Sequence, residues 1–99
     1  MKTKFEELIK DSKPVLVDFF ATWCEPCKVQ AHALELVSAE MGDKVRIIKI
    51  DVEKNPKVAQ KYQIQGVPTL VIFKNGNIIW RNSGVHNKEQ LIDILKTHL

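Results

Sequence analysis

Residues 15–28 read VLVDFFATWCEPCK, and this stretch holds both cysteines of the 99-residue chain, Cys24 and Cys27. The apolar run from Val15 to Phe20 is typical of a buried strand. Pro26 favours the first turn of a helix, because its missing N–H would have had no partner there. The stretch therefore predicts a strand, a turn that carries the cysteines, and a helix that begins at them.

The predicted helix runs from about Cys24 to Met41 and stops at Gly42. Cys24 would lie at its N-terminus, where free backbone N–H groups and the positive end of the dipole stabilise an anion. The relevant anion is the thiolate, which is the attacking species in thiol–disulfide exchange. Cys27, one turn further in, is expected to be less exposed and to resolve the mixed disulfide. The apolar residues at helical spacing are Val29, Ala33, Leu34, Leu36 and Val37.

Two cysteines separated by two residues are also compatible with half of a zinc site or with an unreactive pair in a core. Structural zinc usually has four Cys or His ligands in two such pairs. The other candidates, His32, His86 and His98, have no second-pair spacing. We therefore expect no metal site, and the pattern of strand, CxxC and helix favours redox chemistry.

Residues 15–28 resemble the active-site segment of the thioredoxin family. A second segment, GVPTLVIFKNG from Gly66 to Gly76, is similar to the family's cis-proline strand and the turn after it. Gly84 stands where the family has a late glycine. The resemblance covers nearly the whole chain. It implies an α/β protein with the thioredoxin fold, a three-layer α/β/α sandwich around a mixed sheet.

The composition fits one thioredoxin domain over residues 1–99, because 44% hydrophobic residues suffice for one core. The net charge of +3 comes from charged residues spread along the chain, so we expect no nucleic-acid partner. The start, Met1 to Glu7, has no apolar signal region, and no later segment approaches a membrane span. We therefore expect a cytoplasmic protein that does not bind a membrane.

The elements outside the central stretch follow from local signals. Thr3 and Glu6 predict a capping box for a short helix. The family usually has an edge strand before that helix, so we expect a four-stranded sheet whose first edge strand is missing or vestigial. Further strands are predicted over 45–52, 69–73 and 77–81.

Two more helices are predicted from their caps. Asn55 would cap a helix that starts at Pro56, and Asn87 with Gln90 would cap the last helix. The residues expected on the inner faces of these helices are Val58, Ala59 and Tyr62 in the first, and Leu91, Ile92, Leu95 and Leu99 in the second.

Asp18 stands out because a carboxylate in an apolar central strand is costly to bury and should have a raised pKa. The resemblance implies that Asp18 accepts the proton of Cys27, through water, when that sulfur attacks the mixed disulfide. The alternative is a structural ion pair with Lys49 on the neighbouring strand. Buried carboxylates with shifted pKa values occur both at reactive sites and in ion pairs.

The substrate-binding residues are predicted mainly by the resemblance. Pro68 would be cis and would hold the Val67 backbone against the sulfurs, so that Val67 can pair with an extended substrate segment. Trp23, next to an exposed sulfur, is expected to face the substrate. The full predicted set is Trp23, Glu25, Pro26, Gly66, Val67, Gly84 and Val85, which would form a flat apolar surface for protein disulfides.

Two residues depart from the family pattern. Glu25 stands where the family usually has glycine, and its charge would repel the Cys24 thiolate by on the order of 0.7 kcal/mol at about 6 Å in near-water dielectric. This repulsion destabilises the reduced form, so we expect the cysteine pair to be more reducing than with glycine at this position. The effect should be small, because Lys28 can offset the charge of Glu25. His32 stands where the family has a helix-kinking proline, which predicts a straighter helix with a surface histidine.

The predicted function is reduction of protein disulfides by dithiol–disulfide exchange. Cys24 attacks, Cys27 resolves, no cofactor is bound, and a thioredoxin reductase supplies the electrons to a monomer. One alternative is an oxidase or isomerase of an oxidising compartment. Two others are a binding module with an incidental CxxC and a metal or cluster protein that joins two chains.

Overall fold

Four strands form one mixed sheet in the order β2-β1-β3-β4. They are β1 Val15–Phe20, β2 Arg46–Asp51, β3 Thr69–Lys74 and β4 Asn77–Ser83. Strand β1 pairs parallel with β2 and antiparallel with β3, and β3 pairs antiparallel with β4. The computed structural model describes residues 4–99, so Thr3 and its predicted capping box lie outside the described residues. The predicted four-stranded mixed sheet is confirmed.

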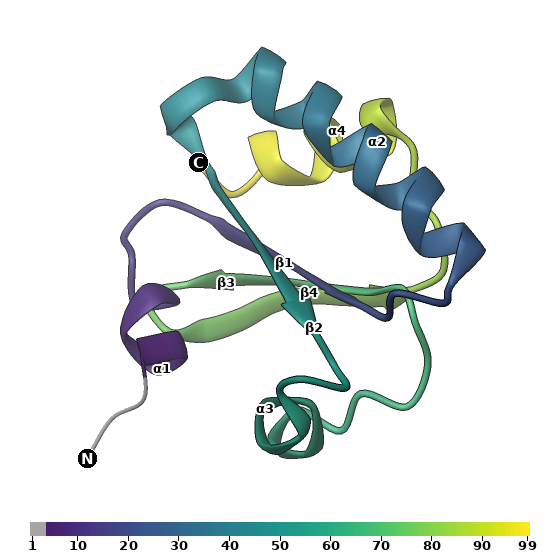
Figure 1. Cartoon of the computed structure of the whole chain (residues 1–99). Helices are drawn as coiled ribbons and strands as arrows, with labels where there is room; N and C mark the ends of the chain where they lie inside the picture. Colours follow the sequence, from purple (N-terminus) through teal and green to yellow (C-terminus); the bar gives the residue numbers. More distant parts are fainter. Residues whose placement is uncertain (1–3) are drawn as a thin grey trace.

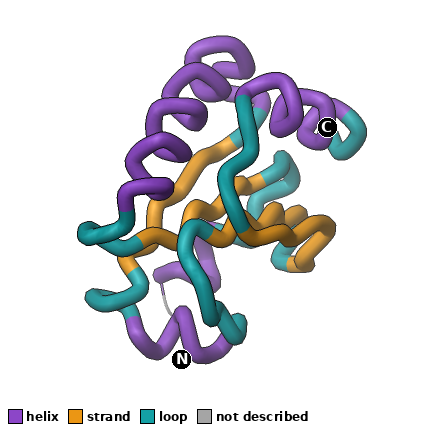
Figure 2. Tube along the Cα trace, turned by 90° about the vertical axis from the view of Figure 1, so that its right-hand side faces the viewer, coloured by secondary structure: helices purple, strands orange, loops and turns teal. Residues whose placement is uncertain are grey.

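The helices cover both faces of this sheet (Figure 1). They are α1 Lys4–Leu8, α2 Glu25–Met41, α3 Pro56–Lys61 and α4 Lys88–Lys96, with a short 3-10 turn η1 Gly42–Lys44. Helices α2 and α4 lie on one face and α1 and α3 on the other, which confirms the predicted three-layer α/β/α sandwich (Figure 2). None of the helices between residues 4 and 99 has the length and apolar character that a membrane crossing needs.

Strand β1 is the centre of the core because both of its faces are covered. Leu16 packs with residues of α2 and α4, whereas Val15, Val17 and Phe19 pack with residues of α1 and α3. Side chains alternate along a strand, so Asp18 shares the α2 side with Leu16. Double burial explains the nearly continuous apolar run, and the strand ends directly before the cysteines.

Helix α2 begins and ends where the sequence predicted. Cys24 is its N-cap with extended backbone, Pro26 lies in the first turn, and Gly42 ends it with a φ of +57°. The buried side chains are Cys27, Gln30, Leu34, Val37 and Met41.

The inner face of α2 differs from the predicted apolar stripe. Leu34 and Val37 are buried, but Val29 and Leu36 are 61% and 44% exposed. The buried line follows the alternating three- and four-residue spacing from Cys27, and that line includes the polar Gln30. The apolar residues at helical spacing in α2 therefore do not all face the core. His32 is exposed and the helix is uninterrupted across it.

Two details of the later helices also differ from the prediction. The Asn55 side chain makes no cap hydrogen bond, because its Nδ2 donates to the Asp51 carbonyl oxygen at 3.0 Å and so closes the turn after β2. Leu99 is 54% exposed, since α4 ends at Lys96. The capping box of Asn87 and Gln90 is confirmed, with both hydrogen bonds at 2.9 Å.

Candidate active site

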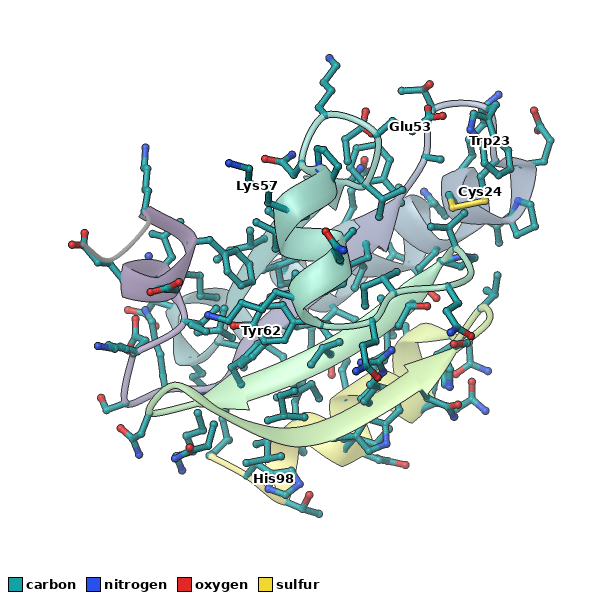
Figure 3. All side chains as sticks on the ribbon, turned by 90° about the horizontal axis from the view of Figure 1, so that it is seen from below. Trp23, Cys24, Glu53, Lys57, Tyr62 and His98 are labelled. Atoms are coloured by element: carbon teal, nitrogen blue, oxygen red, sulfur yellow. A yellow bond between two sulfur atoms is a disulfide. The ribbon has the colours of Figure 1, made fainter. Side chains whose placement is uncertain are left out.

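Cys24 and Cys27 are joined by a disulfide at the start of α2, just beyond the carboxyl end of β1. Their Cα atoms are 5.2 Å apart. Each residue is 4% exposed, so the prediction that Cys27 is the less exposed cysteine is wrong. The pair packs with Ala21 and, at its edges, with Phe20, Val52 and Val67. Figure 3 shows the disulfide at an outer corner of the molecule beside Trp23.

The helix start places hydrogen-bond donors around the Cys24 sulfur. The backbone N–H of Cys27 donates to Cys24 Sγ at 3.2 Å, as a capping interaction does. When the disulfide is reduced, this donor and the positive end of the α2 dipole favour the thiolate of Cys24. The geometry therefore suits Cys24 as the attacking sulfur.

Two distant segments meet the cysteines. The Val67–Pro68 peptide bond is cis, as predicted, and the Val67 carbonyl oxygen lies 3.8 Å from Cys24 Sγ. Thr69 Oγ1 donates to the Gly66 carbonyl oxygen at 2.6 Å, and the backbone N–H of Gly84 donates to the Pro68 carbonyl oxygen at 2.9 Å. The structure thus brings together the segments 24–27, 66–69 and 84, which the resemblance had placed in one site.

The surface around the disulfide is apolar on one side and charged on the other. Trp23 is 67% exposed, Val85 is 44% exposed and Val67 is half-buried. Glu25 and Lys28 form an ion pair at 2.8 Å, with both side chains largely exposed. The predicted flat apolar surface therefore describes the Trp23 side only, because the first turn of α2 adds charge.

Asp18 is fully buried, and neither of its carboxylate oxygens has a hydrogen-bond partner. Burial raises the pKa of Asp18 to about 6, while the charge of Lys49 partly opposes this rise. Strands β1 and β2 are neighbours, as predicted, and their register sets Asp18 opposite Lys49. However, Lys49 Nζ lies over the Phe20 ring, 5.1 Å from its centroid, and no ion pair with Asp18 occurs among residues 4–99. The alternative interpretation of Asp18, a structural ion pair with Lys49, is therefore wrong.

A surface depression of about 220 Å³ lies next to this region. Cys27 and Lys49 both contribute to its wall. It offers water a place beside Cys27 and beside Lys49, the strand partner of Asp18. Its lining residues are Phe20, Ala21, Thr22, Cys27, Lys28, Ala31 and Lys49.

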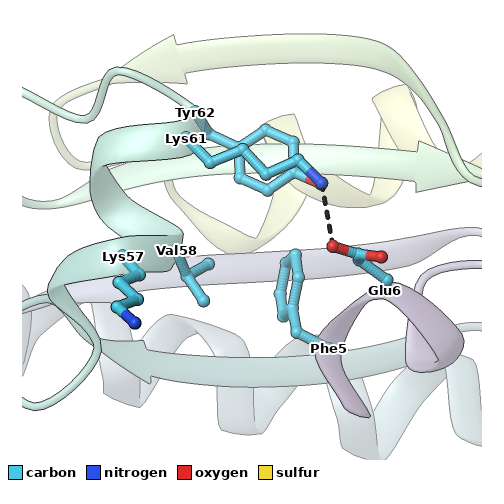
Figure 4. A pocket seen from close by; sticks show the side chains of 6 residues that line it. All are labelled: Phe5, Glu6, Lys57, Val58, Lys61 and Tyr62. Atoms are coloured by element: carbon cyan, nitrogen blue, oxygen red, sulfur yellow. Dashed lines mark hydrogen bonds and ion pairs between the residues drawn. The ribbon is translucent and has the colours of Figure 1, made fainter. Parts of the chain in front are cut away.

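A second depression, of about 150 Å³, lies on the other face of the sheet between α1 and α3 (Figure 4). Its walls are the apolar side chains of Phe5, Val58 and Tyr62, with an ion pair between Lys61 and Glu6 at 3.0 Å. It contains no cysteine, so it is separate from the redox pair. No group of three His, Cys, Asp or Glu side chains in the described part of the chain is arranged to hold a metal ion.

Gln30 is the residue near the site that the sequence analysis missed. It is fully buried on α2, one turn after Cys27. Its side-chain nitrogen and oxygen both form hydrogen bonds with the backbone of His86. The sequence contains one signal for it: Gln30 falls at helical spacing between Cys27 and Leu34, on the buried face, where apolar residues are usual.

Replacing Glu25 with glycine should raise the reduction potential of the cysteine pair by no more than about 15 mV. A repulsion of on the order of 0.7 kcal/mol corresponds to about that value for a two-electron couple, and the ion pair with Lys28 reduces it. Thiol trapping in glutathione buffers measures the shift. Lys28→Gln is the matched variant and should shift the potential downward. An unchanged or lower potential in Glu25→Gly contradicts the prediction.

Comparisons with known proteins agree on one family. A family model described as Thioredoxin matches residues 1–97. The chain is 46% identical over 98 residues to Thioredoxin Y, a chloroplastic protein of Oryza sativa, and the match covers 98% of this chain and 58% of that protein. It is 47% identical over 93 residues to a thioredoxin-like protein of Synechocystis, covering 93% of this chain and 89% of that protein. A mutant thioredoxin from Halobacterium salinarum superposes with a TM-score of 0.88 at 31% identity, covering 99% of this chain and 85% of that one.

Proposed function

The chain belongs to the thioredoxin family of disulfide oxidoreductases, and from this premise we propose that it reduces protein disulfides through Cys24 and Cys27. One observation carries the proposal. The disulfide lies at the N-terminus of α2, where the Cys27 N–H donates to the Cys24 sulfur and the exposed Trp23 lies beside it. Once reduced, a sulfur in this position is activated as a thiolate, and the exposed Trp23 beside it gives another protein a surface to contact.

The exchange proceeds in two steps. The Cys24 thiolate attacks one sulfur of the substrate disulfide, forms a mixed disulfide, and releases the other substrate sulfur as a thiolate. Cys27 loses its proton and attacks the Cys24 sulfur, which releases the second substrate sulfur. Two electrons pass to the substrate, and the chain is left with the Cys24–Cys27 disulfide that the structure contains.

Asp18 is proposed to accept the Cys27 proton through water. Its fully buried carboxylate has no hydrogen-bond partner, and its pKa of about 6 makes it a usable base near neutral pH. The depression beside Cys27 offers room for the intervening water. Val67 is proposed to pair with an extended substrate segment, and Trp23, Glu25, Pro26, Gly66, Gly84 and Val85 are proposed to surround it.

The other partners follow from the same chemistry. A thioredoxin reductase is proposed as the electron donor, because the chain must be reduced again after each turnover. No bound cofactor is proposed, since the redox-active group is the Cys24–Cys27 pair itself. We expect a monomer in a reducing compartment such as the cytoplasm, although the rice relative is named as chloroplastic.

The deciding measurement is the equilibrium of the Cys24–Cys27 couple against glutathione or dithiothreitol, read by thiol trapping. A reductase should have a potential below the cytosolic glutathione poise, which is about −220 to −320 mV depending on the method. A value near or above about −180 mV, typical of oxidising compartments, would overturn the proposal in favour of an oxidase or isomerase. Consumption of NADPH in the presence of a thioredoxin reductase and insulin then tests the electron donor.

A further inference from the structure

Gln30 is a polar side chain in a buried position that apolar residues could fill. It is 0% exposed and lies on α2 between Cys27 and Leu34, both of which are buried. Burying a carboxamide costs free energy unless its donors and acceptors find partners. The buried carboxamide of Gln30 therefore needs hydrogen-bond partners inside the protein.

The side-chain nitrogen and oxygen of Gln30 both form hydrogen bonds with the backbone of a single residue, His86. Gln30 Nε2 donates to the His86 carbonyl oxygen at 3.0 Å, and the His86 N–H donates to Gln30 Oε1 at 2.8 Å. This reciprocal pair resembles one rung of a β-ladder and joins residues 56 positions apart in the chain. In Figure 1 the segment from β4 to α4 runs beside the N-terminal half of α2, where this contact is made. The amide thus ties the segment after β4 to the helix that carries the cysteines.

The tied segment is held at its other end as well. The Gly84 N–H donates to the Pro68 carbonyl oxygen at 2.9 Å, and Gly84 has a φ of +88°. The His86 ring bonds the Gly84 carbonyl oxygen at 2.9 Å and packs edge-on against Trp80. Val85, between the two anchored residues, is 44% exposed. The segment 84–86 is therefore a short loop that is fixed on both sides and displays one apolar side chain.

We propose that Gln30 is a positioning residue for protein substrates: its amide fixes the loop 84–86 beside Cys24, so that Val85 contacts a docked chain. The inference rests on the proposed function, because it assumes that protein disulfides dock on this surface. Helix α2 carries both Gln30 and the cysteines, so the docking loop keeps a constant position relative to the attacking sulfur. Both side-chain hydrogen bonds of Gln30 go to the His86 backbone, so its replacement should not affect exchange with a small disulfide.

The test uses single-turnover reduction by the pre-reduced full chain, with insulin as the protein disulfide and hydroxyethyl disulfide as the small one. Gln30→Met keeps the volume but removes both hydrogen bonds. The half-saturation concentration for insulin should rise about tenfold, and its limiting rate and the small-disulfide rate should stay within about twofold. The reduction potential should not change.

Leu34→Met is the matched control, because it places the same side chain on the same buried face, one helical turn beyond Gln30. It should leave the insulin half-saturation concentration unchanged. Gln30→Leu provides a second replacement without hydrogen bonds, in case the first variant folds poorly. Parallel losses toward insulin and hydroxyethyl disulfide, or an unchanged insulin half-saturation, would overturn the positioning role. If the parent chain itself fails to reduce insulin while it reduces hydroxyethyl disulfide, the proposed function fails instead.

Discussion

A Cys27→Ser variant should accumulate a stable mixed disulfide with its protein substrates, and a Cys24→Ser variant should lose protein disulfide reduction down to the uncatalysed rate. The Cys24 sulfur receives the backbone hydrogen bond at the start of α2, so we expect it to be the sulfur that is activated for attack. Without Cys27, no thiol remains to attack the mixed disulfide, and the substrate stays bound through Cys24.

Non-reducing electrophoresis and mass spectrometry of the variants, after incubation with an oxidised protein such as insulin, measure this result. The trapped species should disappear when dithiothreitol is added, because only a disulfide holds it. The double variant Cys24→Ser, Cys27→Ser is the matched control and should trap nothing. Trapping by Cys24→Ser, through Cys27, would reverse the assigned roles of the two sulfurs.

Much of the fold could be predicted because local signals and long-range packing agree in the central stretch. Three local signals each indicate a single structure: the apolar run of β1 indicates a buried strand, and the proline of α2 and the capping box of α4 indicate helix starts. The failures occurred where residue type or spacing alone did not decide which contact forms. Asn55 is a common N-cap residue, yet its amide bonds the Asp51 carbonyl oxygen instead. Leu99 fits the helical spacing, but α4 ends before it.

The candidate site could be predicted wherever a short motif carries the chemistry, as for the cysteines and Pro68. Contacts between distant side chains could not be predicted in the same way. Strands β1 and β2 are neighbours, as expected, and their register sets Asp18 opposite Lys49, but the Lys49 ammonium lies over the Phe20 ring and leaves the carboxylate unpaired. The Gln30 bonds to His86 depend on how a loop returns to α2, which no local pattern specifies.

Asp18→Asn should stabilise the oxidised chain relative to the parent at pH 8 by about 3 kcal/mol more than at pH 3 or below. Burial raises the pKa of Asp18 from 3.8 to about 6, so the folded state holds a proton that the unfolded state loses between these values. The stability of the parent therefore falls as pH rises from about 4 to 6 and stays lowered above that window. Asparagine does not titrate, and the cost of burying its amide is the same at every pH. Denaturant unfolding of both proteins at several pH values therefore measures the pH-dependent free energy of the Asp18 carboxyl alone. A constant difference between the two proteins across pH 3 to 8 would contradict the raised pKa.

The same substitution tests whether the unpaired carboxylate acts in exchange. If Asp18 accepts the Cys27 proton, Asp18→Asn should slow release of substrate from the mixed disulfide about 10- to 100-fold at pH 7. This factor is at or below the smallest rate effect of a base in direct contact with the proton, because water lies between Asp18 and Cys27. The deficit should shrink near pH 9, because hydroxide then removes the thiol proton without help from a side chain. Formation of the mixed disulfide in a Cys27→Ser background should be unaffected by Asp18→Asn, since Cys24 makes that attack. The outcome that would reject the proton-transfer role is a pH-dependent gain in stability with no change in the release rate, because Asp18 would then be a buried acid that the reaction does not use.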